Sequence, residues 1–72
     1  MNATCIIVDG PFPDTDRDGE EIATYSVCKA DDDGNEVGKV EHYRTYEIAV
    51  SRGLELGRLN PTLELVIEAS RF

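Results

Sequence analysis

Apolar and polar residues alternate along several short segments of this chain, the pattern of strands with one buried face. Residues 3–8 form an apolar, β-branched run that Asp9-Gly10-Pro11 closes, which predicts a strand stopped by a turn. The next segment, residues 10–19, consists of turn-forming residue types. Pro11 and Pro13 keep it extended and lack the N–H groups of a sheet ladder, so we expect a surface loop there.

Residues 21–30 predict a second strand. Its alternation puts Ala23, Tyr25 and Val27 on one face and Ile22, Thr24, Ser26 and Cys28 on the other. Asp33-Gly34 is the expected centre of a hairpin turn because glycine accepts positive φ. Residues 37–43 then return as a third strand.

A helix is predicted from Tyr46 to about Leu59, with Thr45 as its N-cap and Asn60-Pro61 as its end. Its polar sector holds Glu47, Ser51, Glu55 and Arg58, opposite Tyr46, Ala49, Val50, Gly53, Leu54, Leu56 and Gly57. The small residues at positions 49, 53 and 57 would let the helix approach the strands closely.

Residues 62–69 predict a last strand, with Leu63, Leu65 and Ile67 inward and Glu64 and Glu68 outward. The element order is therefore β-β-β-α-β. The sequence predicts an α+β fold, a small and mostly antiparallel sheet of about four strands with one helix packed on one face. Residues 1–72 are expected to form a single domain.

The composition narrows the function through charge. The formal net charge is −8, and all of it lies in residues 9–36, where ten acidic residues face two bases. Such a block repels nucleic acid and anionic membranes and attracts basic proteins or cations. No secretory or membrane-spanning segment is visible, so we expect a cytoplasmic protein with Cys5 and Cys28 as free thiols.

The segment DTDRDG suggests one specific chemistry, because Asp14, Asp16 and Asp18 alternate and Gly19 follows, as in the calcium loop of EF-hands. The pattern then fails, since the twelfth loop position is Tyr25 where a glutamate is needed. A calcium-binding module with a different loop stays an alternative, and residues 31–33 would join it if the two acidic loops met.

A nucleophilic pair of Cys28 and His42 is a candidate for catalysis. If the hairpin pairs residue 30 with residue 37, Cys28 faces Lys39 and His42 faces Tyr25. The thiol and the imidazole then lie on opposite faces, although a shift of one residue would reunite them. Exposed carboxylates keep ordinary acidity and make poor general acids, so we expect no enzyme.

The chain is similar in size, acidity, its two aspartate-rich loops and its lone helix on a small sheet to small acidic phage-borne anti-CRISPR proteins, which inhibit type I CRISPR systems such as type I-C. These proteins share no diagnostic motif, so the resemblance transfers no residue role. It implies a non-enzymatic inhibitor that blocks target DNA binding by a type I surveillance complex inside the bacterial host cell. We expect the inhibitor to be a monomer.

The expected partner is thus a basic nucleic-acid-binding protein complex, contacted without nucleic acid, membrane, metal or cofactor. Carboxylates would stand in for DNA phosphates, which duplex DNA presents at one per about 1.7 Å of axis. The candidate partner-binding residues are Asp14, Asp16, Asp18, Glu20, Glu21, Asp31, Asp32, Asp33 and Glu36. The hypothesis requires these groups to cluster in space. Another alternative is a small protein-interaction domain that uses the sheet face left free by the helix.

Overall fold

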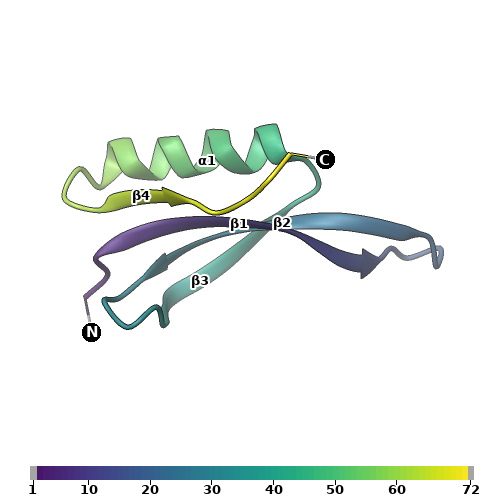
Figure 1. The fold of residues 1–72 in the computed structure, drawn as a ribbon, viewed down its shortest axis with the longest axis horizontal. Helices are drawn as coiled ribbons and strands as arrows, with labels where there is room; N and C mark the ends of the chain where they lie inside the picture. The colour runs from purple at the N-terminus through teal and green to yellow at the C-terminus, as the bar shows by residue number, and fades with distance from the viewer. Residues whose placement is uncertain (1, 72) are drawn as a thin grey trace.

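A computed structural model describes residues 2–71 and has one mixed sheet and one helix (Figure 1). The elements are β1 (Cys5–Thr15), β2 (Glu21–Ala30), β3 (Glu36–Tyr43), α1 (Tyr46–Leu59) and β4 (Glu64–Ile67). The predicted α+β class and the β-β-β-α-β order are confirmed.

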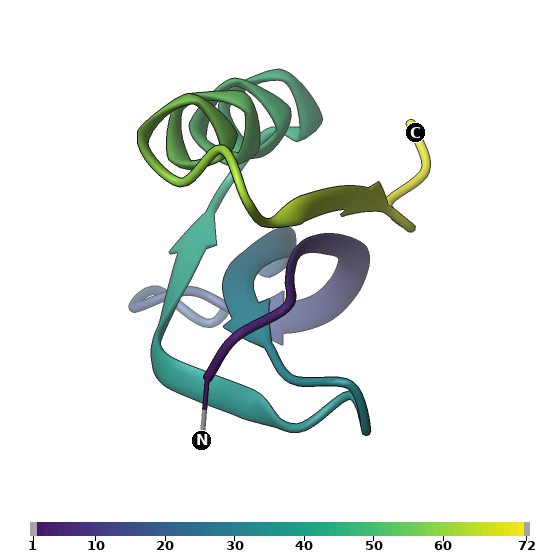
Figure 2. The same cartoon turned by 90° about the vertical axis from the view of Figure 1, so that its left-hand side faces the viewer.

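The strand order is β3-β2-β1-β4, so the first strand of the chain lies inside the sheet. β1 pairs antiparallel with β2, and β2 pairs antiparallel with β3. β4 pairs parallel with β1, from Cys5↔Glu64 to Val8↔Ile67. Figures 1 and 2 show α1 lying over one side of the strands, while the opposite side carries no helix within residues 2–71.

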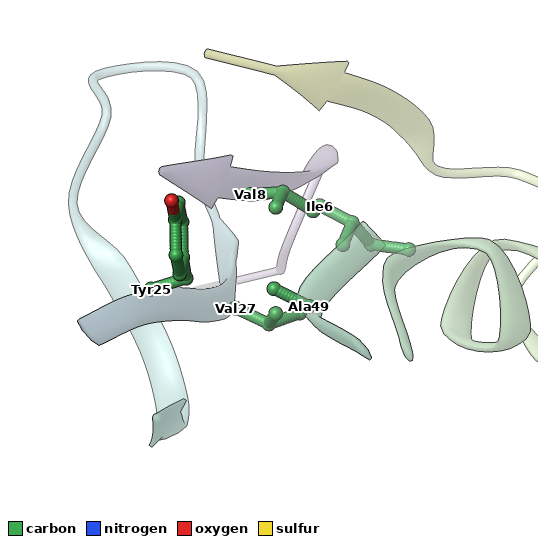
Figure 3. Close-up of a cluster of buried hydrophobic side chains, with 5 residues drawn as sticks. All are labelled: Ile6, Val8, Tyr25, Val27 and Ala49. Carbon is green, nitrogen blue, oxygen red and sulfur yellow. The ribbon is translucent and has the colours of Figure 1, made fainter. Parts of the chain in front are cut away.

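The core fills the space between α1 and the central strands (Figure 3). Ile6, Val8, Tyr25, Val27 and Ala49 form its buried cluster, each 3% exposed or less. Tyr25 and Val27 point to this side and the flanking residues do not, which confirms the alternation predicted for the second strand. Below, the covered face means the side that carries these residues, and the uncovered face means the other side.

The helix begins and ends where its sequence predicts. The Thr45 hydroxyl accepts a hydrogen bond from the Ile48 N–H, and the Asn60 N–H donates to the Leu56 carbonyl. Gly53 is the point of closest approach, because a Cβ there would lie 2.6 Å from Val8 Cγ2. A Cβ at Gly57 would meet no atom within 4 Å, so this glycine is not required for packing.

Two predicted inward positions are wrong. Leu54 is 56% exposed on the helix, and Ile67 is 43% exposed at the end of β4. Leu54 lies at the border of the apolar sector, next to the polar side of the helix. β4 is also shorter than the predicted residues 62–69, although the Glu68 and Ala69 N–H groups continue the contact by donating to the Val8 carbonyl.

The predicted loop over residues 10–19 is wrong as well, because β1 continues through most of it to Thr15. The pairing with β2 shifts between Asp9 and Phe12, where Gly10 has a φ of +131°. The prolines are tolerated because β4 stops pairing at Val8, so no neighbouring strand needs their missing N–H groups. Only residues 16–20 form a turn between β1 and β2.

The register expected for β3 is also wrong. Ala30 pairs with Glu36, and beyond a shift between Val27 and Lys29 the pairing is Ser26↔His42 and Tyr25↔Tyr43. The shift coincides with Gly38, whose φ is +84°. Since Cys28 and Ser26 share a face, Cys28 and His42 lie on the same face of the sheet, contrary to the expectation from sequence.

A candidate acidic interaction surface

The two aspartate-rich segments form turns of the same construction. In the first, Asp16 Oδ1 accepts hydrogen bonds from the N–H groups of Asp18 and Glu20, each at 2.9 Å. In the second, Asp31 Oδ1 accepts from the N–H groups of Asp33 and Asn35, each at 3.0 Å. The fourth residue of each turn is a glycine with positive φ, +85° at Gly19 and +83° at Gly34.

The shared turn construction gives the alternating aspartates a structural role. The sequence D-x-D-G occurs at residues 16–19 and again at 31–34, and in both places its first aspartate holds the turn together. Asp31 is only 6% exposed. Asp16 and Asp31 are therefore turn-forming residues, and the spacing that resembles a calcium loop is explained by backbone hydrogen bonds.

The turns lie at opposite ends of β2 (Figure 1). The ten residues of β2 span about 30 Å of extended chain. Asp14, Asp16, Asp18, Glu20 and Glu21 gather at one end, and Asp31, Asp32, Asp33 and Glu36 at the other. The nine candidate residues thus form two groups and not the single patch that the hypothesis required, and the two loops do not meet.

Further carboxylates lie between the two groups, on the uncovered face. Cys5 pairs with Ala30 and Glu64, so Glu64 lies on this face near the second turn. Asp9 pairs with Ser26, halfway along β2. Glu68 directly follows β4, and its N–H donates to the Val8 carbonyl, so its backbone lies next to this part of β1. Asp14, opposite Ile22, continues the face toward the first turn. A row of acids therefore connects the two turns.

The sequence reading did not place Asp9, Glu64 and Glu68 in the site. Their signal was the alternation itself, because Glu64 and Glu68 were expected to point outward and Asp9 has the parity of Cys5 and Ile7. What was missing was the pairing of β4 with β1. This pairing brings residues 64–68 beside the acidic half of the chain.

On the side with the helix, three acidic residues form ion pairs with arginines within residues 2–71. Arg52 bridges Glu41 and Glu55, with Arg52 Nε 2.8 Å from Glu41 Oε1. The hydrogen bond from Arg52, together with one from the Tyr43 hydroxyl, lowers the pKa of Glu41 to about 2. The same bond to Glu41 raises the pKa of Tyr43.

At the start of the helix, Arg71 lies 3.5 Å from Glu47 and its guanidinium stacks over the Tyr46 ring, 5.1 Å from the ring centre. Glu41, Glu47 and Glu55 are the three acids that pair with a base within residues 2–71. Three of the fifteen acidic residues are thus paired. The remaining twelve belong to the turns, the strand ends next to them and the uncovered face.

The geometry gives little support for the two other candidates, a calcium site and a nucleophilic pair of Cys28 and His42. Within residues 2–71, no group of three or more His, Cys, Asp or Glu side chains is arranged to hold a metal ion. Cys28 and His42 share a face, yet no hydrogen bond joins them in that part of the chain. Burial and, second, the charge of Glu36 raise the pKa of the Cys28 thiol, so it is a weak nucleophile.

Comparisons of the chain with protein-family models, with curated proteins and with solved structures find no match. In the described part of the chain, α1 is too short and too polar to cross a membrane.

Proposed function

We propose that this protein is a non-enzymatic inhibitor that occupies a basic, nucleic-acid-binding groove of a protein partner, its carboxylates standing in for phosphates. The nine candidate residues do not form the single cluster that the sequence hypothesis requires, so the support comes instead from the separation of charge between the two sides of the sheet. The acids near the helix are held in ion pairs, whereas those of the turns and the uncovered face meet no base within residues 2–71. Carboxylates that meet no base in this part of the protein are available to pair with basic groups of a partner.

The dimensions suit a groove that holds duplex. Eleven carboxylates besides the buried Asp31 pair with no base within residues 2–71, and they are distributed along a molecule 39 Å long. That is one charge per about 3.5 Å, roughly half the axial charge density of duplex DNA. The two turns, about 30 Å apart, would contact the groove near its two ends and the row on the uncovered face would contact its middle.

The resemblance implies that the target is the DNA path of a type I CRISPR surveillance complex, and we propose this complex as the partner. Such a path is positively charged and recognises the nucleic-acid backbone, so it would attract a row of carboxylates even at this lower charge density. Direct binding of nucleic acid is disfavoured by the net charge of −8.

A competition experiment tests this function. Purified type I-C surveillance complex is mixed with fluorescently labelled target duplex and increasing amounts of the protein, at 50 and 200 mM salt. We expect the protein to displace the duplex and its apparent affinity to fall steeply with salt, because exposed charges are screened within about 8 Å at physiological ionic strength. Binding that leaves the duplex in place, or displacement that is independent of salt, would contradict the proposal.

A further inference from the structure

The β1–β2 hairpin extends beyond the rest of the sheet as an arm, defined here as residues 11–24 (Figure 1). β4 stops pairing at Val8 and β3 stops at Tyr25. Past these points, within residues 2–71, the two strands pair with each other alone. An isolated two-stranded hairpin is marginally stable in water, so this arm is stabilised when a partner packs against it.

The arm carries an open groove with an apolar floor and an acidic rim. Pro11, Phe12, Pro13 and Ile22 contribute apolar surface to it, and Asp14 and Glu21 are its acidic lining residues. Phe12 is 42% exposed. Phe12 pairs with Thr24 and Asp14 pairs with Ile22, so the ring and the carboxylate lie on one face, two residues apart.

The carboxylate of Asp14 is only partly used by the protein. Its Oδ1 accepts a hydrogen bond from the Thr15 N–H at 2.8 Å, and within residues 2–71 no base pairs with it. The end of the arm carries Asp18, Glu20 and Glu21 besides Asp14 and Asp16, against Arg17 alone. The charge around the groove therefore selects a cation, and its apolar floor selects one with an apolar stem.

We propose that this groove binds an arginine side chain of the protein partner, with the guanidinium over the Phe12 ring and paired with Asp14, and the stem against Ile22. This inference rests on the proposed function and adds which residue of the partner the arm contacts. Arginine fits better than lysine, because its planar guanidinium stacks on an aromatic face while it donates to a carboxylate. The molecule already uses this combination where Arg71 stacks on Tyr46 and pairs with Glu47.

The test is an NMR titration of the ¹⁵N-labelled protein with three blocked pentapeptides that differ only in a central arginine, lysine or citrulline. We expect the arginine peptide to shift the amide signals of residues 12, 14, 15 and 22–24 and to bind about two- to fivefold more tightly than the lysine peptide. Citrulline, which is neutral, should cause no shift.

Phe12→Leu keeps an apolar side chain and removes the aromatic ring, so it should bring the arginine and lysine peptides to equal affinity. Leu59→Ala, at another exposed apolar position (69% exposed) on the helix, is the matched control and should keep the preference. Unchanged amide signals outside the arm establish that each variant is folded.

Equal affinity for arginine and lysine in the unmodified protein, or shifts centred on residues 31–36, would overturn the inference. Either result would leave the proposed function intact, because that function requires only a cationic partner and is tested by displacement of DNA. If the protein failed to displace DNA but still preferred the arginine peptide, the proposed function would be wrong and the arginine-binding groove would stand.

Discussion

The covered and the uncovered face of the sheet differ in what their carboxylates do. On the side of the helix, Arg52 of α1 pairs with Glu41 of β3 and, within the helix, with Glu55, so charge contributes to the fold. On the other side, Asp9 and Glu64 meet no base within residues 2–71, and neither does Glu68, which directly follows β4. Like charges in such a row repel each other, so the uncovered face opposes folding slightly in exchange for a surface that a cationic partner can neutralise.

The largest effect should come from reversing charge on one face and not on the other. The double variant Glu64→Lys/Glu68→Lys and the double variant Glu47→Lys/Glu55→Lys change the net charge equally. We expect the first to weaken binding to the surveillance complex about 100-fold, or about 2.7 kcal/mol, and the second to weaken it less than tenfold. Displacement of labelled target DNA measures both. Equal losses would mean that only net charge matters.

The packing of the covered face is tested by two glycines of the same helix. Gly53→Ala should lower the free energy of unfolding by about 2 kcal/mol, because the new Cβ would overlap Val8 Cγ2 and overpacking outweighs the gain in helix propensity. Gly57→Ala has free space and should raise it by up to about 1 kcal/mol. Urea denaturation gives both values, and a stabilising Gly53→Ala would show that the helix does not sit this close to β1.

The division of labour among the turn aspartates predicts a somewhat smaller effect. Asp31→Ala removes the acceptor of two backbone hydrogen bonds and should lower the free energy of unfolding by about 1.5 kcal/mol. Asp32→Ala removes an exposed charge and should change it by less than about 0.5 kcal/mol. Thermal unfolding followed by circular dichroism compares them. Similar values for the two variants would refute the turn-forming role of Asp31.

The smallest effect concerns pH. Because Arg52 lowers the pKa of Glu41 from 4.5 to about 2, the stability that Glu41 contributes is complete above pH 4.5 and is lost as the pH falls toward 2. Glu41→Gln should therefore lower the free energy of unfolding by about 1 kcal/mol at pH 7 and by almost nothing near pH 2. Urea denaturation at several pH values shows this. A difference that does not depend on pH would exclude the ion pair as its cause.

Local patterns predicted the elements well. The alternation around Tyr25 and Val27 and the cap at Thr45 depend on neighbours in sequence, so both are confirmed. The β3 register was missed because it depends on a bulge at Gly38, and a lone glycine in a strand does not show by how much the pairing shifts. The arm was missed because Pro11 and Pro13 resemble a loop when the absence of a neighbouring strand is unknown.

The candidate site was predicted in part. The acidic residues were identified, but a strand of ten residues between two of their clusters already implies about 30 Å of separation. The proximity of Glu64 to Cys5 could not be read from sequence, because a parallel pair between chain segments so far apart leaves no local signal.

The position of β1 inside the sheet also has a consequence for how the chain folds. β1 pairs with β2 through a short turn, whereas its other edge pairs with residues 64–67. The first contact closes a small loop and forms early, and the second must wait until almost the whole described chain is available. During synthesis on the ribosome, this edge of β1 therefore stays unpaired until β4 has been made. A chain interrupted before Leu65 would expose a free strand edge prone to aggregation.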